Sequence, residues 1–230
     1  MFEASAFAER AFRRIPIGLL RAEDLVFSDG FRARRADELL KRGLDLSVSA
    51  GLTLLAAPLI GLSALLIRLE SRGPVFYHQE RLGKGGRSFN LTKLRTMRAD
   101  AEATGAPIWA KQNDDRVTRV GRLLRKTRMD ELPQILAVLR GDMSFVGPRP
   151  ERPFFVAQIK EKVPFYELRE VARPGITGWA QVRYPYGASI EDARNKLEYD
   201  LYYLKNRSFF LDLTILFHTV RHVLTGRGAR

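Results

Sequence analysis

The sequence predicts a mainly helical α+β protein. It would consist of a re-entrant membrane helix-break-helix, a small cytoplasmic domain with a short β-hairpin, and interfacial amphipathic helices. Three observations predict this fold: residues 46–67 are uncharged, basic residues flank this run on both sides, and short strand-like segments give way to helical ones beyond residue 73. The net charge of +13 indicates an anionic partner: nucleic acid, an anionic membrane surface or a phosphorylated substrate. With no cysteine, disulfides are excluded and a reducing compartment is expected.

Residues 1–40 combine short apolar patches with many arginines, and a turn is expected at residues 27–31. No self-contained domain is expected there. The uncharged run of residues 46–67 comes next, and about 22 helical residues reach roughly 33 Å, enough to cross a hydrocarbon core. Pro58 lies near its middle, where a proline removes a backbone hydrogen bond and predicts a kink.

Basic clusters stand at both ends of this run, and such clusters prefer the cytoplasmic side of a membrane. They consist of Arg32, Arg34, Arg35, Lys41 and Arg42 before the run, and Arg68, Arg72, Arg81, Lys84 and Arg87 after it. A single span would place one cluster outside, whereas a helix that bends at Pro58 and returns keeps both inside. A kinked spanning helix remains the alternative, and a buried core helix is the third, least favoured by so long an uncharged run.

Residues 75–79 and 89–94 predict two short strands around the glycine cluster at 83–86. That cluster predicts a hairpin turn rather than a phosphate loop. No glycine begins the phosphate-loop pattern, and Gly85 follows Lys84 where serine or threonine is needed.

Helices are predicted at residues 118–126, 133–139, 191–207 and 209–224. The last is amphipathic, and it could either lie in a membrane interface or close the core. His218 and His222 are one helical turn apart, but no third ligand is evident, so a metal site built on them is not expected.

The adjacent carboxylates Asp130 and Glu131 directly follow three cations within residues 125–128. Such acids would stay ionised at neutral pH. Ionised carboxylates suit attack on phosphorus, or the binding of a hard cation such as Mg²⁺. The structural alternative is that Asp130 is an ordinary helix N-cap and Glu131 complements the helix dipole.

Two loops rich in glycine and proline present an arginine each. Arg149 lies within residues 140–150, and Arg173 begins residues 173–179. Rigid basic loops hold phosphate oxygens in bidentate fashion, although a solvated basic loop explains either one alone equally well.

With these segments identified, the chain closely resembles the bacterial sugar transferases that start polyprenyl-linked glycan assembly, the monotopic phosphoglycosyl transferases. The resemblance covers roughly residues 40–225. The matching segments, in chain order, are KRGLD (41–45), GPVFYHQER (73–81), KLRTM (93–97), RVGRLLRKT (119–127), DELPQ (130–134), GDMSFVGPRP (141–150) and RPGITGW (173–179).

The resemblance implies a membrane helix hairpin at residues 41–70, broken at Pro58, with Ala57 in place of the serine that often precedes this proline. It implies a catalytic domain at 71–207 and a C-terminal amphipathic helix and tail at 208–230. The C-terminal part resembles a longer subgroup linked to exopolysaccharide export, whose members carry extra membrane helices. Residues 1–40 resemble the end of that region, so the chain is expected to be a natural short form or a truncated one.

The implied reaction moves a sugar phosphate from a UDP-sugar to undecaprenyl phosphate with Mg²⁺ and releases UMP. Asp130 would be the nucleophile that forms an aspartyl phosphosugar, and Glu131 would bind Mg²⁺. The residues expected to contact phosphates are Lys93, Arg95, Arg125, Arg149 and, more weakly, Arg173.

The expected location is the cytoplasmic face of the bacterial inner membrane, among membrane lipids, with no nucleic-acid partner. The sugar stays open, and a homodimer is compatible with a large membrane-facing surface. Two rivals stand: a non-catalytic, membrane-anchored basic adaptor that binds anionic lipid or nucleic acid, and an inactive fragment.

Overall fold

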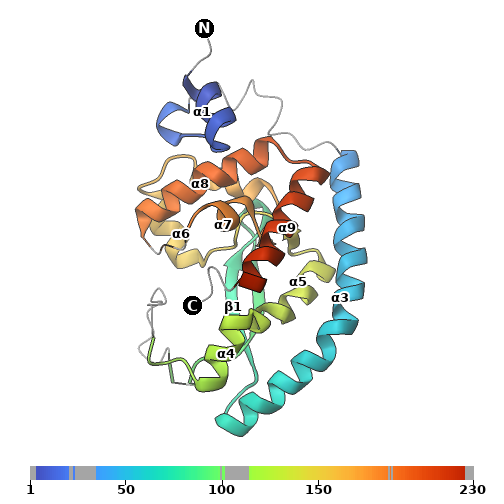
Figure 1. Cartoon of the computed structure of the whole chain (residues 1–230). Coiled ribbons are helices and arrows are strands. Elements are labelled where there is room, and N and C mark those ends of the chain that lie inside the picture. The colour runs from blue at the N-terminus through green and yellow to red at the C-terminus, as the bar shows by residue number, and fades with distance from the viewer. Residues whose placement is uncertain are drawn as a thin grey trace.

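The computed structural model describes residues 4–20, 23, 35–98, 100–101, 114–185, 187 and 189–225. Its longest element is helix α3 (Arg35–Glu70), which runs along one side of the molecule and bends near its middle (Figure 1). Pro58 lies inside this helix, where it lacks the N–H that a straight helix would use. The bend agrees with the kink predicted at Pro58, but α3 continues through this residue as one α-helix, so the predicted break into two helices stays a prediction.

Helix α3 exposes leucines along much of its length: Leu54, Leu55, Leu62 and Leu69 are 79, 69, 55 and 75% exposed. By length and composition, Ala36–Glu70 could cross a membrane. So many exposed leucines are costly in water, because burying each one removes about 1.5–3 kcal/mol of unfavourable hydration. The exposed leucines therefore indicate an apolar environment for this part of α3.

The N-terminal part of α3 is bound to the remainder of the fold. Arg42 donates to the carbonyls of Val138 (2.6 Å) and Leu139 (2.8 Å). Asp45, only 2% exposed, accepts from the Ser144 hydroxyl and the Phe145 N–H, both at 3.0 Å. The start of the uncharged run therefore lies against protein.

Strands β1 (Phe76–Leu82) and β2 (Ser88–Leu94) form the predicted antiparallel hairpin, in which Phe76 pairs with Leu94 and Leu82 with Ser88. A single 3₁₀ turn, η3 (Lys84–Gly86), joins them. Gly85 and Gly86 have φ values of +69° and +72°, which glycine adopts without steric cost. The glycine cluster is a hairpin turn, as the sequence predicts.

Helix α4 (Arg119–Thr127) follows, capped by Thr118, whose side chain accepts from the Gly121 N–H. The 3₁₀ helix η4 (Met129–Gln134) and helix α5 (Ile135–Arg140) come next. These elements cover the helices predicted at 118–126 and 133–139, except that residues 133–134 belong to η4.

Two very short strands, β3 (Ser144–Val146) and β4 (Gly175–Thr177), pair in parallel. A Cβ on Gly147 would lie 2.4 Å from the Arg173 carbonyl oxygen, and one on Gly175 would lie 2.1 Å from the Gly147 nitrogen. Only glycine permits this approach, so the two basic loops of the sequence are in fact joined back to back.

The remaining elements form a helical layer over the hairpin (Figure 1). They are α6 (Pro153–Lys160), η5 (Tyr166–Val171), α7 (Trp179–Arg183), α8 (Ile190–Lys205) and α9 (Phe209–Thr225). Helices α8 and α9 match the predictions for 191–207 and 209–224.

The main core contains Trp179, Leu197 and Leu201, each at most 1% exposed. Helix α9 confirms one of the two positions left open for it, closure of the core, and a place in a membrane interface stays a prediction. Its inner face closes the core through Ile215 (0% exposed), while Phe210 remains 78% exposed on the opposite side.

The N-terminal elements α1 (Ala4–Phe12) and η1 (Ile17–Leu19) lie against α8 (Figure 1). The Ile15 N–H donates to the Glu198 carbonyl (3.0 Å), and the Ile17 N–H donates to Glu198 Oε1 (3.1 Å). Ile15 and Ile17 both belong to the main core. This part of residues 1–40 is thus packed into the fold, whereas the turn expected at 27–31 lies outside the described residues.

Candidate active site

The acid pair lies in η4, directly after a sharp change of chain direction. Helix α4 ends at Thr127, and Arg128 adopts a left-handed conformation with φ +60°. Arg128 therefore occupies the position before η4, and Asp130 lies inside its first turn without a capping hydrogen bond. The N-cap interpretation of Asp130 is wrong, because the left-handed residue moves the helix start two residues earlier.

Glu131 is held by two cations from distant segments. Its Oε1 accepts from Lys93 Nζ on β2 at 3.0 Å and from Arg149 Nη2 at 2.7 Å. The Glu131 side chain is 11% exposed. Strand β2, η4 and the loop after β3 therefore converge on a single carboxylate oxygen.

Asp130 is 8% exposed, and no hydrogen bond to its side chain is found in the part of the chain that the structure describes. Burial and the neighbouring charge of Glu131 raise the pKa of Asp130, although Lys93, Arg125 and Arg128 oppose this shift. The sequence suggested that the cations would keep both acids ionised alike. In the structure, burial and the charge of Glu131 raise the pKa of Asp130, so the two acids differ.

Burial also disfavours the charge on Glu131, but Arg149 and Lys93 outweigh it and hold the pKa of Glu131 well below its usual range. The pair thus contains one carboxylate, that of Glu131, with two bonded cations and a lowered pKa, beside the buried carboxylate of Asp130, whose pKa is raised. Burial lowers the pKa of Lys93, and Glu131 works against that shift.

Arg125, a predicted phosphate contact, lies on α4 and donates from Nε to the Thr96 hydroxyl at 2.9 Å. Its charge lowers the pKa of Asp130, as does that of Arg128. Sequence reasoning left Arg128 out of the site, although it lies in the cationic segment just before the acids.

Arg95 occupies a structural position. It is 6% exposed and donates to the Arg72 carbonyl (2.7 Å) and to Ser71, through both the carbonyl (2.9 Å) and the hydroxyl (2.8 Å). These groups follow the C-terminal end of α3, where carbonyls need donors. Its role as a phosphate contact therefore stays a prediction.

Arg173 is not among the largest influences on the pKa of Asp130 or Glu131. It instead contributes, after Lys84 and Arg207, to the lowered pKa of Glu38 near the start of α3. Lys93, Arg125 and Arg149 gather around the acids, whereas Arg173 belongs to a different cluster of charges. Its predicted phosphate contact also remains a prediction.

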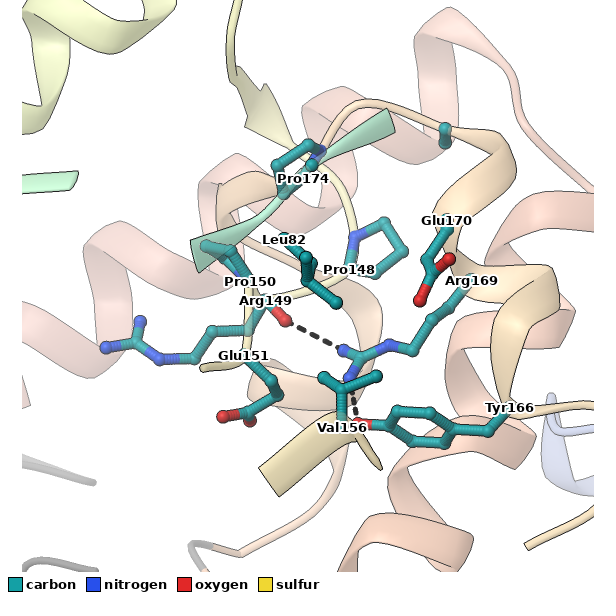
Figure 2. A pocket seen from close by; sticks show the side chains of 12 residues that line it. Leu82, Pro148, Arg149, Pro150, Glu151, Val156, Tyr166, Arg169, Glu170 and Pro174 are labelled. Carbon is teal, nitrogen blue, oxygen red and sulfur yellow. Dashed lines mark hydrogen bonds between the residues drawn. The ribbon is translucent and has the colours of Figure 1, made fainter. Parts of the chain in front are cut away.

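Arg149 projects from a loop fixed on several sides. The Gly147 N–H donates to the Thr177 carbonyl and the Gly175 N–H to the Pro148 carbonyl, both at 2.9 Å. Figure 2 shows the Arg149 guanidinium directed away from the pocket beneath this loop, while its carbonyl oxygen faces Arg169. The accessible interior of that pocket is about 20 Å³, which is room for roughly one water molecule and far too little for a nucleotide.

The acid pair offers oxygen donors of the kind that Mg²⁺ prefers. Mg²⁺ is commonly bound by one or two carboxylates together with substrate phosphates. Glu131 supplies a hard anionic oxygen donor of this kind. Within the described ranges no cluster of three His, Asp or Glu side chains could hold a metal by itself. The residues present fit Mg²⁺ only where substrate phosphates supply the remaining oxygen ligands.

Curated relatives are similar over most of this chain. A protein from Aeromonas hydrophila, named UDP-N-acetylgalactosamine-undecaprenyl-phosphate N-acetylgalactosaminephosphotransferase, is 50% identical over 83% of this chain and 45% of its own length. A UDP-glucose:undecaprenyl-phosphate glucose-1-phosphate transferase from Caulobacter vibrioides is 46% identical over 85% of this chain and 74% of its own. An exopolysaccharide production protein from Rhizobium leguminosarum is 42% identical over 84% of this chain and 99% of its own length.

The match to the Aeromonas relative thus spans about half of that longer protein, whereas the match to the Rhizobium relative spans nearly all of it. A family model described as bacterial sugar transferase matches residues 36–226. The resemblance that the motifs predict is confirmed: the chain belongs to the bacterial sugar transferase family.

Proposed function

We propose that this protein moves a sugar-1-phosphate from a UDP-sugar to undecaprenyl phosphate, through a covalent intermediate on Asp130 and with release of UMP. One observation carries the proposal: Lys93 and Arg149 neutralise Glu131, while the adjoining Asp130 is buried and its side chain has no hydrogen bond to any residue that the structure describes. A carboxylate of raised pKa is a better nucleophile than an ordinary one, and this one lies where cations can bind phosphate oxygens.

In the first step an Asp130 oxygen forms a bond to the sugar-bearing phosphorus. The bond from that phosphorus to the bridging oxygen breaks, and its electrons leave with UMP. Lys93, Arg125 and Arg149 stabilise charge on the phosphate oxygens during the displacement. Their positive charge also offsets the repulsion between a carboxylate and a diphosphate.

In the second step a phosphate oxygen of undecaprenyl phosphate attacks the same phosphorus. The bond between Asp130 and phosphorus breaks, which restores the carboxylate and yields undecaprenyl diphosphosugar. Because the intermediate stores the sugar phosphate, two anionic substrates need not occupy the small site together.

Glu131 would hold Mg²⁺ with the donor diphosphate, which leaves Asp130 to act as the nucleophile. When bound, the ion supplies a positive charge that polarises the phosphoryl group and offsets charge on the departing UMP. The protein places Glu131 for this role, because Lys93 and Arg149 hold its carboxylate from two sides.

We further propose that α3 enters the bilayer and returns, so that the catalytic part stays on the cytoplasmic face of the bacterial inner membrane. Both ends of α3 contact the same domain. Near its start Lys41 pairs with Asp212 at 2.5 Å, and at its end Glu70 accepts from the Arg119 N–H at 2.7 Å. A straight spanning helix would place these contacts on opposite sides of the membrane, so their coexistence supports re-entry.

A role in the first membrane step of exopolysaccharide synthesis is also proposed. The Rhizobium protein, whose name refers to exopolysaccharide production, aligns with this chain over 99% of its length. The sugar remains to be identified by experiment, and the relatives suggest both UDP-glucose and UDP-N-acetylgalactosamine as donors to try first.

The reaction is tested by UMP release from protein in nanodiscs with Mg²⁺, undecaprenyl phosphate and a panel of UDP-sugars. We expect lipid-dependent release with one sugar, abolished by Asp130→Asn and unchanged by Glu161→Gln at an exposed position after α6. An Asp130→Asn variant that still turned over would disprove the nucleophile assignment. Wild type inactive with every donor would favour the membrane-anchored adaptor.

The metal assignment is tested with Glu131→Gln in the same assay. We expect lower activity together with a weakened response to Mg²⁺ across the titration. A normal Mg²⁺ titration in this variant would remove Glu131 from the metal site.

A further inference from the structure

A buried polar cluster lies directly beneath the loop that presents Arg149, outside the acid pair. Arg169, on η5, donates from Nη2 to the Arg149 carbonyl at 2.9 Å and from Nη1 to the Tyr166 hydroxyl. Figure 2 shows the Arg169 guanidinium between these two oxygens at the centre of the pocket. The same Nη2 lies 2.9 Å from Asp200 Oδ2 on α8.

This cluster is nearly sealed from water. The Arg169 side chain is 10% exposed and that of Asp200 is 2% exposed. Asp200 Oδ2 lies at ion-pair distance but outside hydrogen-bond geometry, so the attraction is mainly between charges. Glu151 and Lys196 also act on Asp200: the charge of Lys196 lowers its pKa and that of Glu151 raises it.

Stability alone does not explain the ion pair. Burial raises the pKa of Asp200 to about 6 against the opposing charges of Arg169 and Lys196. A raised pKa for an acid means that its contribution to stability is present at low pH and is lost as pH rises through about 6. At neutral pH the fold thus carries an ionised carboxylate that is unfavourable to bury, and buried ion pairs are often replaceable by apolar residues without loss.

The orientation of the Arg149 carbonyl is the part of this backbone that Arg169 restrains. Pro148 and Pro150 flank Arg149, and a residue before proline is restricted to extended conformations. Its carbonyl orientation then decides the direction of the following chain. Arg169 holds that carbonyl, and Arg81 Nη1 holds the next one, that of Pro150, at 2.8 Å.

We propose that Arg169 is a positioning residue for Arg149: it fixes the Arg149 carbonyl so that the guanidinium on the other side of the loop reaches Glu131 and the donor phosphates, and Asp200 holds Arg169 in place. The chain of contacts runs from Asp200 through Arg169 and Arg149 to Glu131 and so joins α8 to the acid pair. This inference rests on the proposed transferase function for its catalytic consequence.

The proposal is tested by a double-mutant cycle with Arg169→Gln and Arg149→Lys, with kcat/KM for UMP release as the readout. We expect Arg169→Gln alone to lower kcat/KM by about ten- to hundred-fold, as small misplacements of a binding group do. In the Arg149→Lys background the same change should cost less than about twofold, because Arg169 acts through the Arg149 guanidinium. Independent, multiplicative losses would overturn the proposal.

Asp200→Asn gives a second test with a matched control on the same helix. Glu198 is similarly buried (8% exposed), but it pairs with Arg14 (3.5 Å) and the Ile17 N–H rather than with the Arg149 loop. We expect Asp200→Asn to lower kcat/KM, again with little further loss in the Arg149→Lys background, while Glu198→Gln lowers only the thermal midpoint. Equal effects of the two changes on kcat/KM would contradict the proposal.

The same cycle can be read without turnover, from the affinity for UDP by calorimetry. Coupling between positions 169 and 149 in UDP affinity, in a protein that transfers no sugar, would leave the positioning role standing while the transferase proposal fails. If the wild type transfers sugar phosphate but neither readout shows coupling between positions 169 and 149, the transferase proposal stands and the positioning role of Arg169 is wrong.

Discussion

At the scale of single residues, Asp130 and Glu131 are neighbours whose carboxylates behave in opposite ways. Burial is the largest influence on both and disfavours the charge on each. The difference arises because Lys93 and Arg149 bond to Glu131, whereas the Asp130 side chain has no such partner within the described ranges. The charge on Glu131 is therefore stabilised, whereas the charge on Asp130 is disfavoured.

The first prediction at this scale concerns Asp130→Asn. Because the pKa of Asp130 is raised in the folded protein, its contribution to stability is present at low pH and is lost as pH rises through that pKa. We expect Asp130→Asn to raise the thermal midpoint at pH 7.5 by about 2–4 °C for each kcal/mol gained, and this gain to shrink as the pH is lowered. A lower midpoint at pH 7.5 would show that Asp130 stabilises the fold.

Glu131→Gln should have the opposite effect on stability. The pKa of Glu131 is depressed, so its contribution is present above its ordinary pKa and is lost as pH falls through the folded value. Removing the charge leaves Lys93 and Arg149 together without their shared anion. We expect a loss of about 1–3 kcal/mol by thermal or denaturant unfolding at pH 7.5. Unchanged stability would mean that the ion pairs are not formed in solution.

Sequence motifs were sufficient to find the acid pair and the cations that gather round it, Lys93, Arg125 and Arg149. They could not show that Arg95 lies at the end of α3 or that Arg173 belongs to another cluster, because those positions depend on where distant loops pack. The sequence likewise gives no sign that Arg128 adopts a left-handed backbone conformation, which is uncommon for any residue other than glycine.

At the scale of elements, the site depends on close backbone contacts at a few glycines. Gly121 of α4 packs against the chain that follows β2: a Cβ there would lie 2.0 Å from the Thr96 carbonyl oxygen. The same region carries the bond from Arg125 to the Thr96 hydroxyl. The packing of α4 therefore sets the position of Arg125 beside Asp130.

We predict that Gly121→Ala destabilises the protein by about 1–3 kcal/mol, since α4 must move away from β2. Gly43→Ala in α3 is the matched control, because a Cβ at that position would meet no atom within 4 Å among the described residues, apart from the neighbouring backbone of α3 itself. That change should be neutral or stabilising by up to about 1 kcal/mol, given the helix propensity of alanine. Thermal unfolding of both variants checks this, and equal effects would refute the packing argument.

The hairpin and the two C-terminal helices were predictable because their signals are local: strand residues around a glycine turn, and apolar residues at helical spacing. The β3–β4 pair was not, since three-residue strands have no periodicity to detect and their pairing joins residues 144–146 to 175–177. The sequence showed two separate basic loops, and only the fold shows that they share one glycine contact.

At the scale of the whole molecule, the path of α3 is the main question of topology. The segment that precedes α3 in the chain is hydrogen-bonded to α8, which comes after α3: the Ile15 N–H donates to the Glu198 carbonyl. Chain on both sides of the apolar helix thus belongs to one folded unit. Charge patterning and Pro58 predicted re-entry from sequence, and the spanning alternative would have to break these contacts.

Cysteine labelling in intact cells tests this path, and the cysteine-free chain provides a clean background. Ala11→Cys precedes α3 and Ser88→Cys follows it, and both positions are exposed. We expect a membrane-impermeant reagent to label neither from outside and both after the cells are opened. Labelling of one position alone from outside would establish a spanning helix and contradict re-entry.

The central claim is that Asp130 carries the sugar phosphate, and trapping that species tests it most directly. The protein is incubated with the UDP-sugar that supports turnover and with Mg²⁺, but without undecaprenyl phosphate, and is then quenched in acid and analysed by peptide mass spectrometry. The account predicts a sugar-phosphate adduct on the peptide that contains Asp130, absent from Asp130→Asn and chased off by undecaprenyl phosphate. Turnover without any adduct, with transfer retained in Asp130→Asn, would contradict it.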